Sequence, residues 1–146
     1  MRSLTIAFFL MLLVASIAMA GFTLKSGVYR MDQLDDAKAE ALSSGKPVAF
    51  LYSDKNTTCP LCAGASKNAM ETLASSCVIV YAEKADWAKM PKPVRTAINA
   101  PEAGKYIPTV VVMSPNVKEV IVIVPYAQGQ EYKRLLYAAK EKISRY

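Results

Sequence analysis

The sequence predicts an α/β protein in which helices cover both faces of a central mixed β-sheet, a three-layer α/β/α arrangement. Short apolar runs rich in Val and Ile alternate along the chain with amphipathic segments that have the helical period. Strands that are joined through helices become parallel neighbours. The last two apolar runs are separated only by a tight turn, so we expect them to pair as an antiparallel hairpin. The chain of 146 residues has room for one such domain.

The first 20 residues form a leader in which 16 side chains are apolar. Arg2 supplies a positive charge, residues 4–17 are the apolar stretch, and Ala18-Met19-Ala20 has the small-x-small pattern of a cleavage site. The sequence therefore predicts a cleavable signal peptide over residues 1–20 and a mature domain over residues 21–146. A retained membrane anchor is the alternative, and the apolar stretch is slightly shorter than the ~20 residues that a spanning helix needs.

This leader predicts export to the periplasm or the extracellular space, with a bacterial periplasm as the expected compartment. Because no second long apolar run follows, we expect no stable membrane insertion after cleavage. Disulfides form and persist in such an oxidising compartment.

The composition excludes several kinds of chemistry. The chain carries 18 Lys and Arg against 12 Asp and Glu, a net charge of +6, and it has no His. Ser-His-Asp and Cys-His nucleophile systems are excluded, and so are His-ligated zinc, copper and haem. The sequence has no nucleic-acid-binding motif, and its basic residues are interpreted as a solvated face.

The sequence predicts a helix, a strand, a helix and a strand in the first half of the domain. Residues 32–44 have a helical apolar pattern, and Gly45 with Pro47 stops this helix. Residues 48–52 are a buried strand, residues 60–73 a helix and residues 77–81 a second buried strand. The inward side chains expected on the two helices are Leu34, Ala37, Ala41 and Leu42, and then Ala65, Ala69, Met70 and Leu73.

The second half predicts an irregular stretch, a hairpin and a helix. Residues 82–107 are irregular, with Trp87 as a packing residue in a short helical piece. Residues 109–113 and 117–124 are the hairpin strands, joined by a turn at Ser114-Pro115-Asn116. The inner stripe of the last helix is expected to consist of Tyr132, Leu135, Leu136, Ala139, Ile143 and Tyr146.

The motif Cys59-Pro60-Leu61-Cys62 lies between a buried strand and the start of a helix. At the helix N-terminus, unpaired N–H groups and the positive dipole end stabilise a thiolate. Cys62 lies about one helical turn further on, so its sulfur can close a disulfide with Cys59. Such a pair attacks a substrate disulfide through Cys59 and resolves the mixed disulfide with Cys62.

Two other interpretations of this motif are an inert local disulfide and half of a zinc site. Zinc needs two more ligands, and only Cys77 is left among the cysteines, so no metal is expected. Cys77 is interpreted as a small buried hydrophobe, with a regulatory or intermolecular disulfide as the alternative.

A second motif, Ile107-Pro108-Thr109, stands directly before a buried strand. With the strand before Cys59, the helix after it and the final hairpin and helix, it resembles the thioredoxin superfamily, and in particular the exported thioredoxin-like proteins of bacteria. The resemblance implies a thioredoxin-like fold in which Pro108 is the cis-proline. It also implies that substrate docks on Ile107 and Pro108, and on Pro60 and Leu61 of the redox motif.

The sequence departs from that family in three places. Thr58 stands where thioredoxin has Trp, and Leu61 offers no hydrogen-bond donor to a thiolate. The strand over residues 48–52 lacks the buried Asp of thioredoxin, and Asp54 is interpreted as a solvated surface residue. These departures favour reductase or isomerase activity over strong oxidation.

The predicted function is that of a thiol–disulfide oxidoreductase that acts on protein substrates, with Cys59 as nucleophile and Cys62 as resolving thiol. It needs no bound cofactor, since electrons pass to or from a redox partner protein. The alternative is a non-catalytic thioredoxin-like binding module in which the Cys59–Cys62 disulfide is structural.

Overall fold

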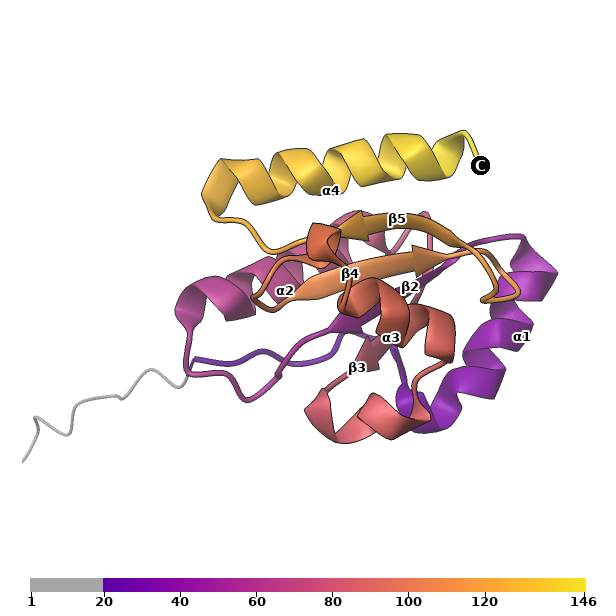
Figure 1. The fold of residues 1–146 in the computed structure, drawn as a ribbon, viewed down its shortest axis with the longest axis horizontal. Helices are drawn as coiled ribbons and strands as arrows, with labels where there is room; N and C mark the ends of the chain where they lie inside the picture. Colours follow the sequence, from indigo (N-terminus) through magenta and orange to yellow (C-terminus); the bar gives the residue numbers. More distant parts are fainter. Residues whose placement is uncertain (1–19) are drawn as a thin grey trace, which may run out of the picture.

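The computed structural model describes residues 20–146 (Figure 1). The expected signal peptide lies outside the described residues except for Ala20, so the domain boundary at residue 21 stays a prediction.

Five strands form one sheet in the order β1-β3-β2-β4-β5. β3 runs parallel to β1 and β2, whereas β4 is antiparallel to both β2 and β5. The predicted mixed sheet with a terminal hairpin is therefore confirmed. The strands are β1 (Tyr29–Arg30), β2 (Val48–Tyr52), β3 (Val78–Ala82), β4 (Thr109–Met113) and β5 (Val120–Val124).

The described residues also form four α-helices and three short 3-10 helices. The α-helices are α1 (Leu34–Ser44), α2 (Pro60–Leu73), α3 (Lys92–Ile98) and α4 (Gly129–Ser144). The 3-10 helices are η1 (Met31–Gln33), η2 (Lys84–Lys89) and η3 (Pro101–Ala103). α1 stops where the sequence predicts, because Gly45 adopts the left-handed conformation with φ of 71°.

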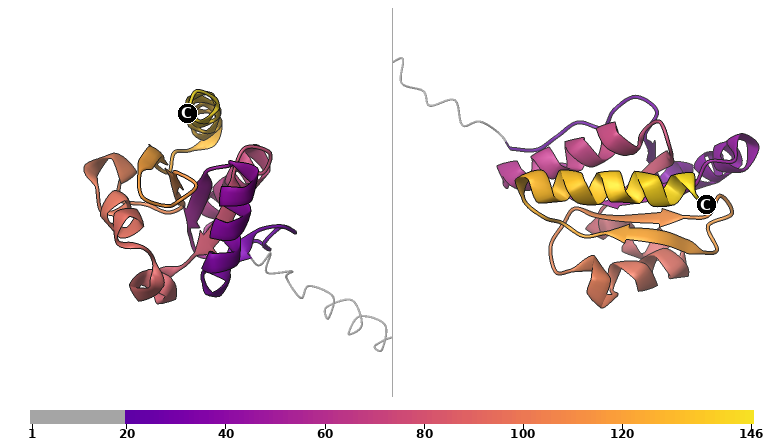
Figure 2. Two further views of the ribbon diagram at one scale, coloured as in Figure 1. Left: turned by 90° about the vertical axis from the view of Figure 1, so that its right-hand side faces the viewer. Right: turned by 90° about the horizontal axis from the view of Figure 1, so that it is seen from above.

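Alternate side chains of the strands enter two separate apolar cores. Ala49 and Leu51 of β2 pack with residues of α2 and α4, whereas Val48 and Phe50 pack with residues of α1 and α3. This alternation is what a sheet covered on both faces requires. The sheet lies between two helical layers, and the predicted three-layer α/β/α fold is confirmed. α2 and α4 run side by side on one face (Figure 2, right).

The structure corrects the predicted elements in four places. β1 was not predicted, and β5 begins at Val120 rather than at Val117, because residues 114–119 form the hairpin turn. Cys77 precedes β3 rather than opening it. Leu42 and Tyr146 are exposed rather than inward. α1 packs through Ala37 and Ala41, which leaves Leu42 turned about 100° away, and Tyr146 lies beyond the end of α4.

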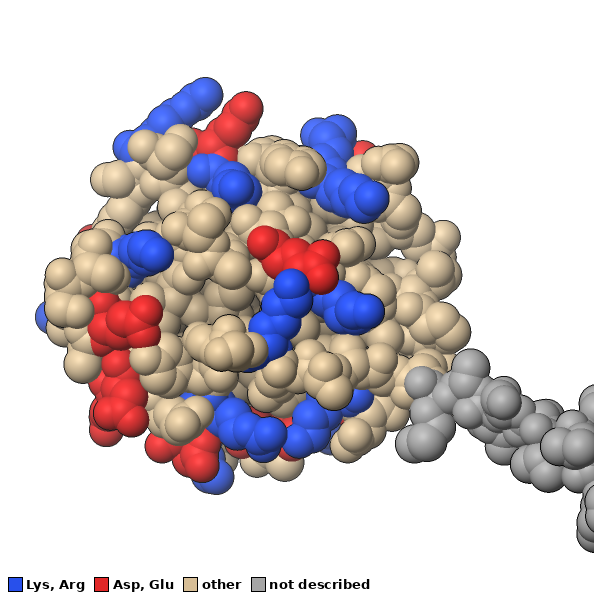
Figure 3. All heavy atoms as spheres, turned by 180° about the vertical axis from the view of Figure 1, so that it is seen from behind, with Lys and Arg blue, Asp and Glu red and all other residues tan. Residues whose placement is uncertain are grey.

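The surface of the described domain mixes acidic and basic side chains (Figure 3). None of the helices within residues 20–146 has the length and hydropathy to cross a membrane. The same residues bring no three His, Cys, Asp or Glu side chains together as a metal site.

Candidate active site

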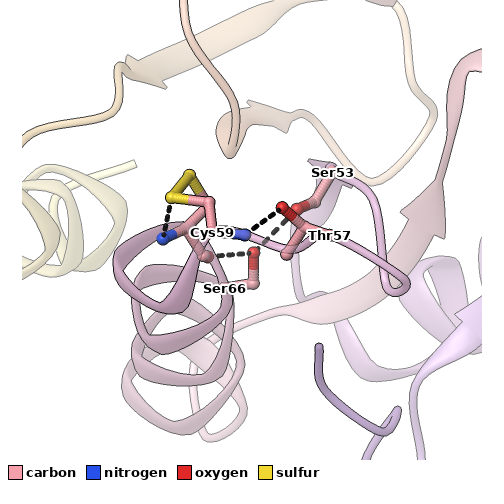
Figure 4. The surroundings of a disulfide bond; sticks show 5 residues. Ser53, Thr57, Cys59 and Ser66 are labelled. Atoms are coloured by element: carbon pink, nitrogen blue, oxygen red, sulfur yellow. Dashed lines mark hydrogen bonds between the residues drawn. A yellow bond between two sulfur atoms is a disulfide. The ribbon is translucent and has the colours of Figure 1, made fainter. Parts of the chain in front are cut away.

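The structure joins Cys59 and Cys62 in a disulfide at the start of α2 (Figure 4). Cys59 is the N-cap residue in extended conformation, and Pro60 occupies the first turn, where it gives up no hydrogen bond. The two Cα atoms lie 5.2 Å apart. The backbone N–H of Cys62 donates to Sγ of Cys59 over 3.1 Å, so one of the unpaired amides of the helix end points at this sulfur.

The loop before Cys59 is held by side chains that the sequence prediction did not single out. Oγ1 of Thr57 accepts a hydrogen bond from the backbone N–H of Cys59 over 3.2 Å. The hydroxyl of Tyr81 accepts the backbone N–H of Lys55 over 2.8 Å and lies 3.1 Å from a carboxylate oxygen of Glu83. Burial raises the pKa of the Tyr81 hydroxyl, so this group stays neutral. These contacts fix the approach of the chain to the disulfide.

Two buried serines connect the end of β2 to the Cys59–Cys62 disulfide. The hydroxyls of Ser53 and Ser66 lie 2.7 Å apart, and Ser66 donates to the backbone carbonyl of Cys62 over 3.0 Å (Figure 4). Since Ser66 donates to that carbonyl, Ser53 supplies the proton between the two hydroxyls. Ser53 is 3% exposed and Ser66 is fully buried, so this is an interior network.

No carboxylate of the described residues is buried next to the Cys59–Cys62 pair. Within residues 20–146, the buried polar side chains are Ser53, Ser66, Thr109 and Ser114. Asp54 is exposed as expected, and it accepts the backbone N–H of Asn56 in a turn. The polar group that lies inside next to Cys62 is therefore a neutral hydroxyl.

Pro60 and Leu61 lie on the outer side of the disulfide. Both are exposed, with Leu61 at 56%, and both line a hollow of about 260 Å³ between α2 and the segment that leads into α4. Cys59 and Cys62 are half-buried, so a partner molecule can approach this end of α2.

Pro108 follows a cis peptide bond, as the resemblance implies. It directly precedes Thr109, which pairs with Tyr52 at the end of β2, so the proline lies at the same end of the sheet as the redox loop. Pro108 itself is buried, and Ile107 is half-buried in a second hollow, next to Ser53 and Asp54. Pro60 and Leu61 thus line one hollow and Ile107 another, and Pro108 lines neither of the two.

Cys77 is 4% exposed, and burial raises the pKa of its thiol to about 12. It is a free thiol that lies with the apolar residues between the sheet and α2 and α4. This environment fits the interpretation of Cys77 as a small hydrophobe.

The strand order, the Cys pair at the start of the helix after β2, and the cis-proline before β4 occur together in one domain. The fold is thioredoxin-like. A solution structure of a thioredoxin from Thermus thermophilus is similar to the chain, with a TM-score of 0.46 and 17% sequence identity, covering 76% of this chain and 84% of that one. No protein-family model matches the sequence, and no curated protein is significantly similar to it.

The sequence does not predict the serine pair, because Ser53 opens the polar stretch of residues 53–58 that leads to Cys59. One signal was available: Ser66 falls three, four and seven residues before Ala69, Met70 and Leu73, so it shares the inward face of α2. A hydroxyl on that face needs an interior partner.

Proposed function

We propose that this protein is an exported thiol–disulfide oxidoreductase that acts on protein substrates. The observation that carries the proposal is the position of the Cys59–Cys62 disulfide. It spans the first turn of α2 and is half-buried, and a backbone N–H is directed at the sulfur of Cys59. Donors at that position stabilise the thiolate that thiol–disulfide exchange requires.

In the reduced protein, the Cys59 thiolate attacks one sulfur of a substrate disulfide, and the other substrate sulfur leaves as a thiolate. The Cys62 thiolate then attacks Sγ of Cys59, which releases the first substrate sulfur and closes the Cys59–Cys62 disulfide. The substrate gains two electrons, and the protein loses two. A redox partner protein of the same compartment returns them by the reverse exchange.

We further propose reduction or isomerisation as the direction, rather than strong oxidation. A strongly oxidising pair requires the reduced form to be greatly stabilised. Leu61 contributes no donor or charge to Cys59, and the group next to Cys62 in the interior is a neutral hydroxyl network. In the proposed site, the Cys59 thiolate is therefore stabilised mainly by the N-terminal end of α2.

The test is to equilibrate the pure domain with glutathione and dithiothreitol buffers, and to measure insulin reduction in parallel. We expect a potential for the pair between those of known oxidoreductases, about −270 to −180 mV, together with insulin turnover that Cys59→Ser abolishes. A potential below about −300 mV without turnover is typical of structural disulfides, and would support the binding module instead.

A further inference from the structure

Two hollows meet end to end between α2 and α4. The first begins at Leu61 and Gly64 beside the redox pair, and the second reaches Tyr137 and Lys140 further along both helices. Asn68 of α2 and Lys133 of α4 line both hollows, so the two hollows adjoin. We call this surface the α2–α4 groove, defined by Leu61, Gly64, Asn68, Lys133, Tyr137 and Lys140.

The groove changes character along its length. Its first part is apolar around Leu61 and Gly64, whereas its far part carries two cations, Lys133 and Lys140. The carboxylate that faces this part, Glu71, is bound to Lys25 over 3.2 Å. Among the described residues neither Lys133 nor Lys140 has an ion-pair partner. In Figure 3, basic side chains gather along the upper edge of this face, where α4 runs.

We propose that the α2–α4 groove binds an extended, acidic segment of the substrate polypeptide, next to the cysteine that Cys59 attacks. This inference rests on the proposed exchange reaction and specifies its substrate. The groove starts at the redox pair, where a substrate is held covalently, and its two unpaired lysines complement carboxylates. Tyr137, which is 62% exposed, lies between the lysines along α4 and offers an aromatic face to the same segment.

The helix geometry sets where the acidic residues should stand. Asn68 lies seven residues beyond Leu61, and Lys140 lies seven residues beyond Lys133, which is about 10 Å in each case. An extended chain covers that distance in about three residues. Carboxylates about three and six residues from the reacting cysteine therefore meet Lys133 and Lys140 in turn.

The probe is a synthetic peptide with one cysteine, joined by a disulfide to thionitrobenzoate. The protein is first reduced with dithiothreitol and freed from it. The Cys59 thiolate then bonds to the peptide sulfur, and coloured thionitrobenzoate leaves with the electron pair of the broken S–S bond. Two peptides carry Glu at the third and sixth positions, before or after the cysteine, and two matched peptides carry Gln at the same places.

We expect the better of the two Glu peptides to react about tenfold faster than its Gln partner at low salt, and about equally fast at 1 M salt, where the screening length is about 3 Å. The Lys133→Glu/Lys140→Glu variant should lose or reverse this preference, because its groove repels the carboxylates of the Glu peptide. The control is Lys118→Glu/Lys142→Glu, with the same change of charge at exposed positions outside the groove, and it should keep the preference.

Equal rates for all peptides would contradict the proposal that the groove binds an acidic segment, and so would a preference for Glu that persists in Lys133→Glu/Lys140→Glu. Neither result would contradict the exchange reaction. A second measurement covers the case in which no peptide reacts. Fluorescent Cys→Ser versions of the peptides are titrated into the oxidised protein. Binding of the Glu peptide that depends on Lys133 and Lys140 would then support the groove and contradict only the exchange reaction. If the Glu peptide does not bind selectively, the proposal for the groove is contradicted as well.

Discussion

The hydroxyls of Ser53 and Ser66 lie 2.7 Å apart in the interior, and Ser66 also donates to the carbonyl of Cys62, the second cysteine of the redox pair. Both hydroxyls are buried away from water, and among the described residues the Ser53 hydroxyl has Ser66 as its hydrogen-bond partner. This pair links the residue that follows β2 to the second turn of α2.

Ser66→Ala removes the partner of a buried hydroxyl and should lower the free energy of unfolding by about 1–3 kcal/mol. Ser53→Ala should cost less, because Ser66 keeps its hydrogen bond to the Cys62 carbonyl. The double variant leaves no orphaned group, so its loss should be smaller than the sum of the two single losses by about 1 kcal/mol or more. Urea unfolding of the oxidised proteins measures all three. Ser43→Ala, an exposed control, should change little, and strictly additive losses would refute the coupling.

Leu61→His should move the potential of the Cys59–Cys62 pair to less negative values. Within residues 20–146, Cys59 Sγ receives one hydrogen bond, from the Cys62 N–H, so a second donor or a positive charge beside it favours the reduced form. Each tenfold gain for the reduced form corresponds to about 30 mV. Leu61→Phe, a ring without a donor, is the control in glutathione equilibration, and equal shifts in the two variants would show that the charge plays no part.

Cys77 should resist alkylation in the folded protein. Because burial raises the pKa of its thiol to about 12, almost no thiolate exists at neutral pH. After reduction, iodoacetamide should modify the Cys59–Cys62 pair, and it should reach Cys77 only after urea is added. Mass spectrometry of the digested protein measures this, and rapid modification of Cys77 without urea would contradict its placement.

The same thiol predicts how stability depends on alkaline pH. The folded protein keeps the Cys77 proton up to about pH 12, whereas the unfolded chain releases it near the ordinary value of 9.0. The folded state binds more protons between these values, so the free energy of unfolding falls as the pH rises through them. Cys77→Ala should make that fall shallower without abolishing it, because burial also raises the pKa of Tyr81 and Tyr132. An unchanged slope would contradict the assignment.

Tyr132→Phe should leave the protein as stable or make it more stable by about 1 kcal/mol. Tyr132 is 1% exposed, and its hydroxyl has no hydrogen-bond partner among the described residues, so it bears a desolvation penalty. Tyr126→Phe is the control, since its ring lies 6.3 Å from that of Tyr132 and it is only half-buried. A loss of more than about 1 kcal/mol in Tyr132→Phe alone would show that the hydroxyl is held by a partner.

Most of the fold follows from local patterns in the sequence. The apolar runs of β2, β3 and β4 and the stop at Gly45 are signals that neighbouring residues determine. β1 has two residues, Tyr29 and Arg30, and it exists only through its pairing with β3, which no local pattern reveals. The sequence predicts too early a start for β5 because Val117 is a strand former, whereas in the structure this residue adopts a φ of 58° in the hairpin turn.

The redox pair was predictable, but its surroundings were not. Cys59, Cys62 and the cis peptide before Pro108 lie where the motifs indicate. The contacts of the two serines and of Tyr81 join residues 13 to 28 positions apart, which only tertiary packing brings together. The contact of Thr57 with Cys59 is local, but it depends on the shape of the loop. Tertiary packing also places Pro60 and Leu61 in one hollow and Ile107 in another.

The measurement that tests the central claim most directly is a trapping experiment with Cys62→Ser. Without the resolving thiol, a substrate attacked by Cys59 stays attached as a mixed disulfide. The proposal predicts covalent protein adducts on Cys59 when Cys62→Ser is produced in and purified from its native host, and none for Cys59→Ser/Cys62→Ser. Purified Cys62→Ser that carries no protein adduct at Cys59, or carries adducts only at Cys77, would contradict it.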